Sequence, residues 1–108
     1  MIARLRRLCL ALPEAEERAT WDTPTFRVRG KIFCLAAEGG AACWVKAPPG
    51  AAAMLIEAAP ERFFRPPYLG HKGWVGIRLA RGTDWAEVAA LVARSHGLVA
   101  PRRRVRHG

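Results

Sequence analysis

The sequence predicts an α+β fold in which helices cover one face of an antiparallel β-sheet. In several short segments apolar residues alternate with polar ones at the period of a strand, and Gly-containing turns join most of these segments. Other segments, at the start, middle and end of the chain, place apolar residues at helical spacing. With 108 residues, the chain is long enough for one domain of two packed layers. The predicted order is a helix, three or four strands, a helix, one or two strands and a final helix.

The first predicted helix lies at the start of the chain and ends before Pro13, because proline disfavours helical geometry in the residue that precedes it. Its apolar residues recur at helical spacing: Ile2, Leu5, Leu8, Cys9 and Leu12. The apolar run within it covers only residues 8–12, which is short for the core of a signal peptide. No run approaches the roughly 20 apolar residues that cross a bilayer. We therefore expect no membrane segment and a cytoplasmic location.

The predicted strands begin with residues 14–21 (EAEERATW), which read as a short edge strand. Residues 25–36 (TFRVRGKIFCLA) predict a β-hairpin. A second hairpin is expected to turn at residues 38–41 and to return through residues 42–46.

The first hairpin is expected to turn at Gly30-Lys31 in a type II′ conformation, since this turn needs a positive φ at its first central residue. This register pairs apolar residues on one face of the hairpin, Val28 with Phe33 and Phe26 with Leu35.

The second half of the chain predicts a helix over residues 48–59, a loop over residues 61–72 and a strand over residues 73–79. A short extended piece is expected in the loop around Phe63 and Phe64. The helix is expected to bury one stripe: Ala51, Met54, Leu55 and Ala58.

The final helix is expected to begin at Asp84, with Glu87 completing a capping box, and to end at Gly97. Its predicted buried stripe is Trp85, Val88, Leu91 and Val92. We expect residues 1–100 to form the single domain and residues 101–108 to form a basic, frayed tail.

Charge is the unusual feature of the composition. Eighteen basic residues face nine acidic ones, which gives a net charge of +9 and a pI near 11.0. Fifteen of the basic residues are Arg, and a guanidinium binds phosphate in bidentate geometry, so an anionic partner such as nucleic acid is favoured. A GC-rich genome gives the same enrichment in Ala, Gly and Arg without selection for binding. The last eight residues hold four of the Arg, which leaves +5 for residues 1–100.

The sequence lacks the signatures of common catalytic and metal sites. Gly70, Gly73 and Gly76 match neither a dinucleotide fingerprint nor a P-loop, and they lead into a strand rather than a helix. No His has a metal-ligand spacing. The three cysteines lie in apolar stretches, which predicts buried, reduced thiols: Cys9, Cys34 and Cys43. We expect a non-enzymatic protein with no cofactor and no metal, although a Cys–His pair that meets only in the fold stays open.

What remains is a set of cations on the predicted hairpin, loop and last strand. A hairpin tip that carries Arg and Lys can contact DNA phosphates as a wing, which supplies affinity but little sequence readout. Exposed edge strands also favour Lys and Arg, because charge resists edge-to-edge pairing, and this alternative stays open. The candidate DNA-binding residues are Arg27, Arg29, Lys31, Arg65, His71, Lys72 and Arg78.

Three stretches carry a resemblance to a known family: LCLALPEAEERATWDTPTFRVRGKIFCLA (8–36), PERFFRPPYLGHKGWVGIRL (60–79) and DWAEVAALVARSHGLVAPRR (84–103). In order and spacing the chain resembles the MmcQ/YjbR family over about residues 2–104. The resemblance implies a CyaY-like α+β fold with a double-wing DNA-binding motif, and it brings no catalytic motif with it.

The leading hypothesis is therefore a non-enzymatic DNA-binding protein that contacts phosphates through a basic hairpin with low sequence specificity. A second hypothesis is an interaction domain that binds a protein or a small molecule through the aromatic and Pro-rich residues 63–74; exposed rings in a concave patch favour it. A third is an unrecognised enzyme built around His71, which a cleft lined by His71 and a carboxylate favours.

Overall fold

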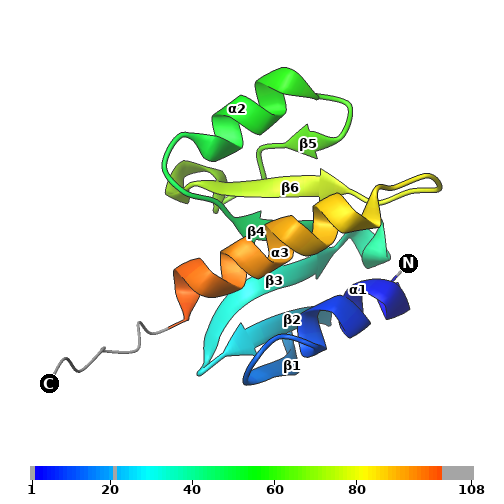
Figure 1. Ribbon diagram of the computed structural model, residues 1–108, viewed down its shortest axis with the longest axis vertical. Coiled ribbons are helices and arrows are strands. Elements are labelled where there is room, and N and C mark those ends of the chain that lie inside the picture. Colours follow the sequence, from blue (N-terminus) through cyan, green and yellow to red (C-terminus); the bar gives the residue numbers. More distant parts are fainter. Residues whose placement is uncertain (1, 21, 101–108) are drawn as a thin grey trace, which may run out of the picture.

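The computed structural model describes residues 2–20 and 22–100. The strands form one antiparallel sheet in the order β1-β2-β3-β4-β6-β5, and the predicted α+β class is confirmed (Figure 1). The elements are α1 (Ile2–Leu10), β1 (Ala15–Thr20), β2 (Thr23–Val28), β3 (Lys31–Ala37), β4 (Ala42–Lys46), α2 (Ala51–Ala58), β5 (Phe63–Phe64), β6 (Trp74–Arg78) and α3 (Trp85–Val99), with single 3₁₀ turns η1 (Glu38–Gly40) and η2 (Gly70–Lys72).

The core lies between the sheet and the helices α1 and α3, which cross the same face of the sheet (Figure 1). Alternate residues of the central strands, such as Phe26, Val45 and Val75, point into this layer and are buried. The predicted stripe of the last helix covers them: Val88, Leu91 and Val92 are buried and Trp85 is partly buried. All three cysteines are buried and free, as expected: Cys9, Cys34 and Cys43.

The β2–β3 hairpin turns one residue earlier than predicted. Val28 pairs with Lys31, so the two turn residues are Arg29 and Gly30, with φ of 51° and 82°. Two positive φ angles are typical of a type I′ turn, whose twist matches that of the flanking strands. The prediction of a type II′ turn at Gly30-Lys31 is wrong, because it weighed the glycine alone and not the left-handed conformation of Arg29.

The predicted register of this hairpin is also wrong, because the earlier turn pairs Val28 with Lys31 and a bulge in β3 then changes the pairs farther from the turn. Phe26 pairs with Cys34 and Arg27 pairs with Ile32, so Phe33 is an extra residue without a partner on β2. A bulge of this kind lets two successive side chains point to the same face. Both Phe33 and Cys34 are fully buried in the core.

Ser95 of α3 completes the hydrogen bonding beside the bulge. Its hydroxyl donates to the Phe33 carbonyl oxygen over 2.6 Å and accepts from the Lys46 backbone N–H over 2.8 Å. Phe33 and Lys46 face each other on β3 and β4, one step beyond the Cys34–Val45 pair. The fully buried Ser95 therefore connects helix α3 to both strands at the point where their ladder opens.

Helix α2 lies beyond β5 at the edge of the sheet (Figure 1), and this position changes the face that it buries. Met54 is 72% exposed and Ala58 is also exposed, so the predicted stripe is wrong at both positions. The residues that pack against the core are Ala51, Ala52, Leu55 and Ile56. A helix that touches only a sheet edge buries a narrower face than one that lies across the sheet.

Helix α3 begins where the sequence predicts and ends later. The Asp84 carboxylate accepts hydrogen bonds from the Ala86 and Glu87 N–H groups, but the Glu87 side chain pairs with Arg62, so the predicted capping box is only half formed. Gly97 stays within the helix, and the prediction that it ends the helix is wrong. The Ala100 N–H still bonds to the His96 carbonyl oxygen. The next residue in the sequence is Pro101, which has no N–H to continue the series of helical hydrogen bonds.

The expected tail, residues 101–108, lies outside the described residues. In residues 2–20 and 22–100, no helix combines the length and the apolar character that a membrane span requires.

Candidate nucleic-acid interface and an adjoining groove

The tip of the β2–β3 hairpin presents fewer free charges than the sequence suggests. The Arg29 guanidinium bonds to the Glu14 carboxylate, with Nε–Oε1 and Nη2–Oε2 distances of 3.0 and 3.3 Å, and this contact raises the pKa of Arg29. The neighbouring Arg27 donates to Thr25 Oγ1, Thr20 Oγ1 and the Gly30 carbonyl oxygen. Since these acceptors are neutral, Arg27 is fixed in place, and no carboxylate of the described residues compensates its charge.

Other carboxylates pair with arginines around β1 and α3. Arg6 bonds to Glu17 over 2.7 Å, and this hydrogen bond lowers the pKa of the Glu17 carboxyl. Further pairs join Arg18 to Glu16, and Arg62 to both Glu61 and Glu87. The sequence carried a signal for the pairs at β1, because three acids lie in or just before the strand that pairs with β2: Glu14, Glu16 and Glu17.

Cations without such partners gather at one end of the sheet. There β2 turns into β3, β4 ends and η2 leads into β6 (Figure 1). Arg29, in the β2–β3 turn, is paired with Glu14 at this end, whereas five other basic side chains form no ion pair with a described carboxylate. We call this set the cationic end: Lys31, Lys46, Arg65, His71 and Lys72.

Lys46 is the member that sequence reasoning missed. It is the last residue of β4 and pairs with Trp74 at the start of β6, which places it at the same end of the sheet as η2. The predicted return strand over residues 42–46 was the available signal, because antiparallel strands bring its end back beside the first hairpin tip.

The three glycines of residues 70–76 serve packing and turn geometry. A Cβ on Gly70 would lie 2.4 Å from Arg65 Cγ, and a Cβ on Gly76 would lie 2.3 Å from the Phe64 ring. Gly73 has a φ of 85°, which favours glycine. The expectation of a loop that enters a buried strand is confirmed.

An open groove of about 620 Å³ lies between α2 and η2. Arg65, His71 and Gly70 line one wall, Ala52, Ala53, Ile56 and Glu57 of α2 line the other, and Trp74 also borders it. The structure thus brings Arg65 and His71 into one groove with α2, which no sequence pattern predicted. His71 and Glu57 face the same groove, as the hypothesis of an enzyme required, but no hydrogen bond joins them.

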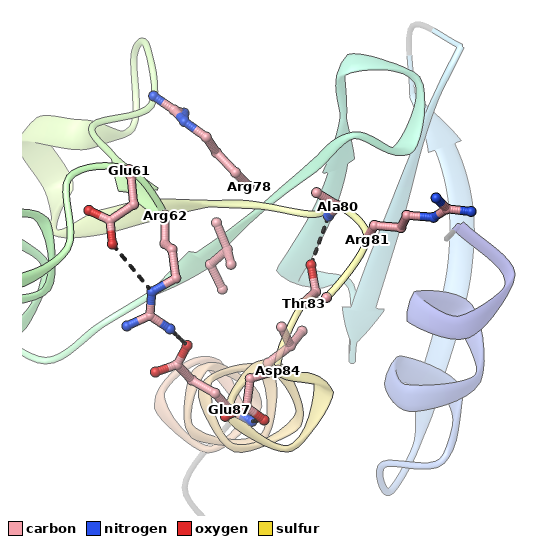
Figure 2. Close-up of a pocket in the computed structure, with 11 residues that line it drawn as sticks. Glu61, Arg62, Arg78, Ala80, Arg81, Thr83, Asp84 and Glu87 are labelled. Carbon is pink, nitrogen blue, oxygen red and sulfur yellow. Dashed lines mark hydrogen bonds and ion pairs between the residues drawn. The ribbon is translucent and has the colours of Figure 1, made fainter.

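Arg78 lies apart from this group. Its guanidinium stacks 4.7 Å above the centre of the Phe64 ring, and it borders a smaller hollow of about 210 Å³. Figure 2 shows Arg78 and Arg81 pointing in different directions, while Arg62 reaches the carboxylates of Glu61 and Glu87. Because Glu61 and Glu87 neutralise Arg62, this hollow is poorly suited to an anion.

The aromatic residues of the segment 63–74 divide between core and surface. Phe63 is buried, Trp74 is 8% exposed and Tyr68 is 87% exposed. In the described residues, no group of three His, Cys, Asp or Glu side chains is arranged to hold a metal ion.

Residues 10–98 match the family model of YjbR. The chain is also similar to the crystal structure of Deinococcus radiodurans protein DR2400, which carries a DUF419 domain. The TM-score is 0.80 at 23% sequence identity, over 91% of this chain and 77% of that one. This likeness shows the fold. A search of curated proteins finds no match.

Proposed function

This chain belongs to the YjbR family, and from that premise we propose that it binds DNA through phosphate contacts at the cationic end, with little sequence preference. The observation that supports the proposal is a group of basic side chains without carboxylate partners at one end of the sheet. Carboxylates compensate Arg6, Arg18, Arg29 and Arg62, while the cationic end has no ion-paired side chain among the described residues. Cations that are free of acids release counterions from DNA when they bind, and this release supplies affinity without reading bases.

The Arg29–Glu14 pair changes how the hairpin takes part in the proposal. A paired arginine would have to give up its carboxylate before it could bind a phosphate, so Arg29 contributes less than its exposed position suggests. Lys31, which is exposed beside the turn, and the fixed guanidinium of Arg27 carry the contacts of this hairpin. We leave Arg78 out of the proposed interface, since it is the last residue of β6, whereas Lys46 pairs with Trp74 at the start of that strand.

Fluorescence anisotropy with a labelled duplex across a series of salt concentrations tests the proposal. Five phosphate contacts, from Arg27 and the lysines and arginine of the cationic end, predict a slope of about −4 to −5 in a plot of log affinity against log salt concentration. Replacing Lys72 by Ala should reduce the slope by about 0.9. The matched control is Arg18→Ala, which removes the same charge from an exposed side chain that is paired with Glu16.

Two results would count against the proposal. If no binding of the duplex is detected near 50 mM salt, the proposed function is wrong. Equal losses in Lys72→Ala and Arg18→Ala show that only net charge matters, so that the cationic end is not an interface.

A further inference from the structure

We propose that the groove between α2 and η2 binds a nucleotide with a terminal phosphate, the phosphate lying at Arg65 and His71 and the base lying against Trp74 and Ile56. This ligand site shares Arg65 and His71 with the cationic end, and it does not require that duplex DNA binds there.

The groove is hollow because its walls are built from small side chains. Ala52 and Ala53 form the α2 side, while glycines form much of the remainder: Gly50, Gly70 and Gly73. The volume of about 620 Å³ falls within the roughly 300–1,000 Å³ that is usual for sites of small organic ligands.

One wall provides groups suited to a phosphate. The aliphatic part of Arg65 lies directly on the backbone of Gly70, where any larger residue would collide with it. This contact limits the positions that the side chain can adopt, and a guanidinium held in this way offers two parallel N–H donors to phosphate oxygens. The imidazole of His71 stands on the same wall and can donate a further hydrogen bond.

The other surfaces suit a flat, partly polar ring. Trp74 is almost completely buried, so the edge that it shows to the groove is fixed, and Ile56 adds an aliphatic surface from α2. Glu57 lies on the α2 wall and forms no ion pair with a described residue. Its carboxylate repels a phosphate on that wall and accepts N–H groups from a base. Guanine presents two adjacent N–H donors that match a carboxylate, so we expect guanine to be preferred over adenine.

A phosphate next to a base has two sources: a free mononucleotide, or the 5′-phosphorylated end of a nucleic acid strand. Isothermal titration calorimetry with GMP, AMP, guanosine and inorganic phosphate measures the first. A tetranucleotide with a 5′-phosphate, compared with the same strand with a 5′-hydroxyl, measures the second. We expect GMP to bind at least about tenfold more tightly than guanosine, since charge-assisted hydrogen bonds are lost with the phosphate.

Two variants of the groove and one control test the assignment. Arg65→Ala should weaken GMP binding about tenfold or more and leave guanosine binding nearly unchanged. Ala53→Leu fills the groove without altering a charge, and it should abolish binding of both. Arg81→Ala removes a cation from the smaller hollow and should bind GMP like the unmodified chain. Circular dichroism and the thermal midpoint verify that each variant folds.

The outcomes separate this inference from the proposed function. A duplex closed by hairpin loops at both ends has no terminal phosphate, so it reports on DNA binding alone. If GMP binds and the closed duplex does not, the groove site stands and the proposed function fails. The inference is overturned if neither GMP nor the 5′-phosphorylated strand binds, if GMP and guanosine bind equally, or if Arg65→Ala binds GMP unchanged.

Discussion

Ser95 replaces a hydrogen bond of the β3–β4 ladder with two of its own. The bulge at Phe33 leaves its carbonyl oxygen facing the Lys46 N–H, and the Ser95 hydroxyl stands between them. This position is shielded from bulk solvent, since Ser95 is fully buried. Loss of the hydroxyl therefore leaves a donor and an acceptor of the backbone without partners in the core, which is more costly than loss of an exposed hydrogen bond.

We expect Ser95→Ala to lower the free energy of unfolding by about 1–3 kcal/mol. Urea denaturation monitored by circular dichroism measures the change. Thr83→Ala is the control, because Thr83 also bonds to a backbone N–H, that of Ala80, but at an exposed position. If both variants lose the same small amount of stability, the bridge between α3 and the two strands is unimportant.

The burial of the cysteine thiols can also be tested at the scale of single residues. Hydrogen bonds with Cys43 and Cys9, together with burial, raise the pKa of the Cys34 thiol well above its ordinary value. A raised pKa stabilises the fold below the ordinary thiol pKa, and this stabilisation is lost as the pH rises toward the raised pKa. The same burial keeps reagents away from the sulfur.

We accordingly expect no reaction of the native protein with Ellman's reagent at pH 8, and reaction of three thiols in denaturant. Absorbance at the wavelength of the released thiolate measures both states. Rapid labelling of even one thiol in the folded protein contradicts the burial of this cluster: Cys9, Cys34 and Cys43.

At the scale of elements, ion pairs connect the first helix and the first strand to their neighbours. Arg6 of α1 forms an ion pair with Glu17 of β1, and Glu14, which precedes β1, forms an ion pair with Arg29 in the β2–β3 turn. The Nε2 atom of His96 lies 2.8 Å from the Pro13 carbonyl oxygen, so α3 also contacts the connection between α1 and β1. These contacts stabilise the position of the edge strand β1, whose middle residues are exposed on both faces.

The Arg6–Glu17 pair gives a pH-dependent contribution to stability. Because its hydrogen bond lowers the pKa of the Glu17 carboxyl, the stabilisation is complete above the ordinary pKa of a glutamate and disappears as the pH falls through the lowered value. We expect Glu17→Gln to lower the thermal midpoint slightly at pH 7 and not at pH 2, since exposed pairs contribute little. A larger deficit at pH 2 than at pH 7 has the wrong sign for this mechanism.

Local patterns predicted the elements well, because each depends on residues close in sequence. The stripe of α3, the strand entering at Trp74 and the cap at Asp84 all follow from spacing within one segment. The bulge in β3 could not be predicted in this way, since the Phe33 carbonyl oxygen is bonded by a serine 62 residues later. The face of α2 was missed for a similar reason, because it depends on which edge of the sheet the helix meets.

For the candidate site, too, local patterns predicted the residues but not their arrangement in space. Composition and spacing identified Arg65 and His71 as cations of interest, and the structure places both in one groove. The groove itself depends on how α2 packs beside η2, which no single segment encodes. Likewise, Arg29 looked free in the sequence because its partner Glu14 lies 15 residues earlier, across a strand pairing.

At the scale of the whole molecule, the side chains of the cationic end form a group without carboxylate partners at one end of the sheet. The ion pairs of the described residues lie mainly beside β1 and near the start of α3. Besides Arg27, five further arginines outside the group also lack an ion pair with a described residue: Arg4, Arg7, Arg78, Arg81 and Arg94. A uniform excess of charge attracts a polyanion in any orientation, whereas a localised excess favours one. The position of the charges should therefore matter more than their number.

This expectation can be tested against the tail. Replacing four arginines by Ala (Arg102, Arg103, Arg104 and Arg106) removes twice as many charges as the double variant Lys31→Ala/Lys72→Ala. We expect the double variant to weaken duplex binding more, measured by anisotropy at 50 mM salt. The opposite order would mean that the arginines after residue 100 carry the attraction.

Both margins of the sheet are closed to a further strand. β1 places Glu16, Glu17 and Arg18 along its length, so an incoming chain would have to accommodate charged side chains on both faces. At the opposite margin β5 is only two residues long and α2 lies just beyond it (Figure 1). A basic protein that gathers on a polyanion reaches high local concentration, and blunted margins of this kind prevent such crowding from ending in fibrous aggregation.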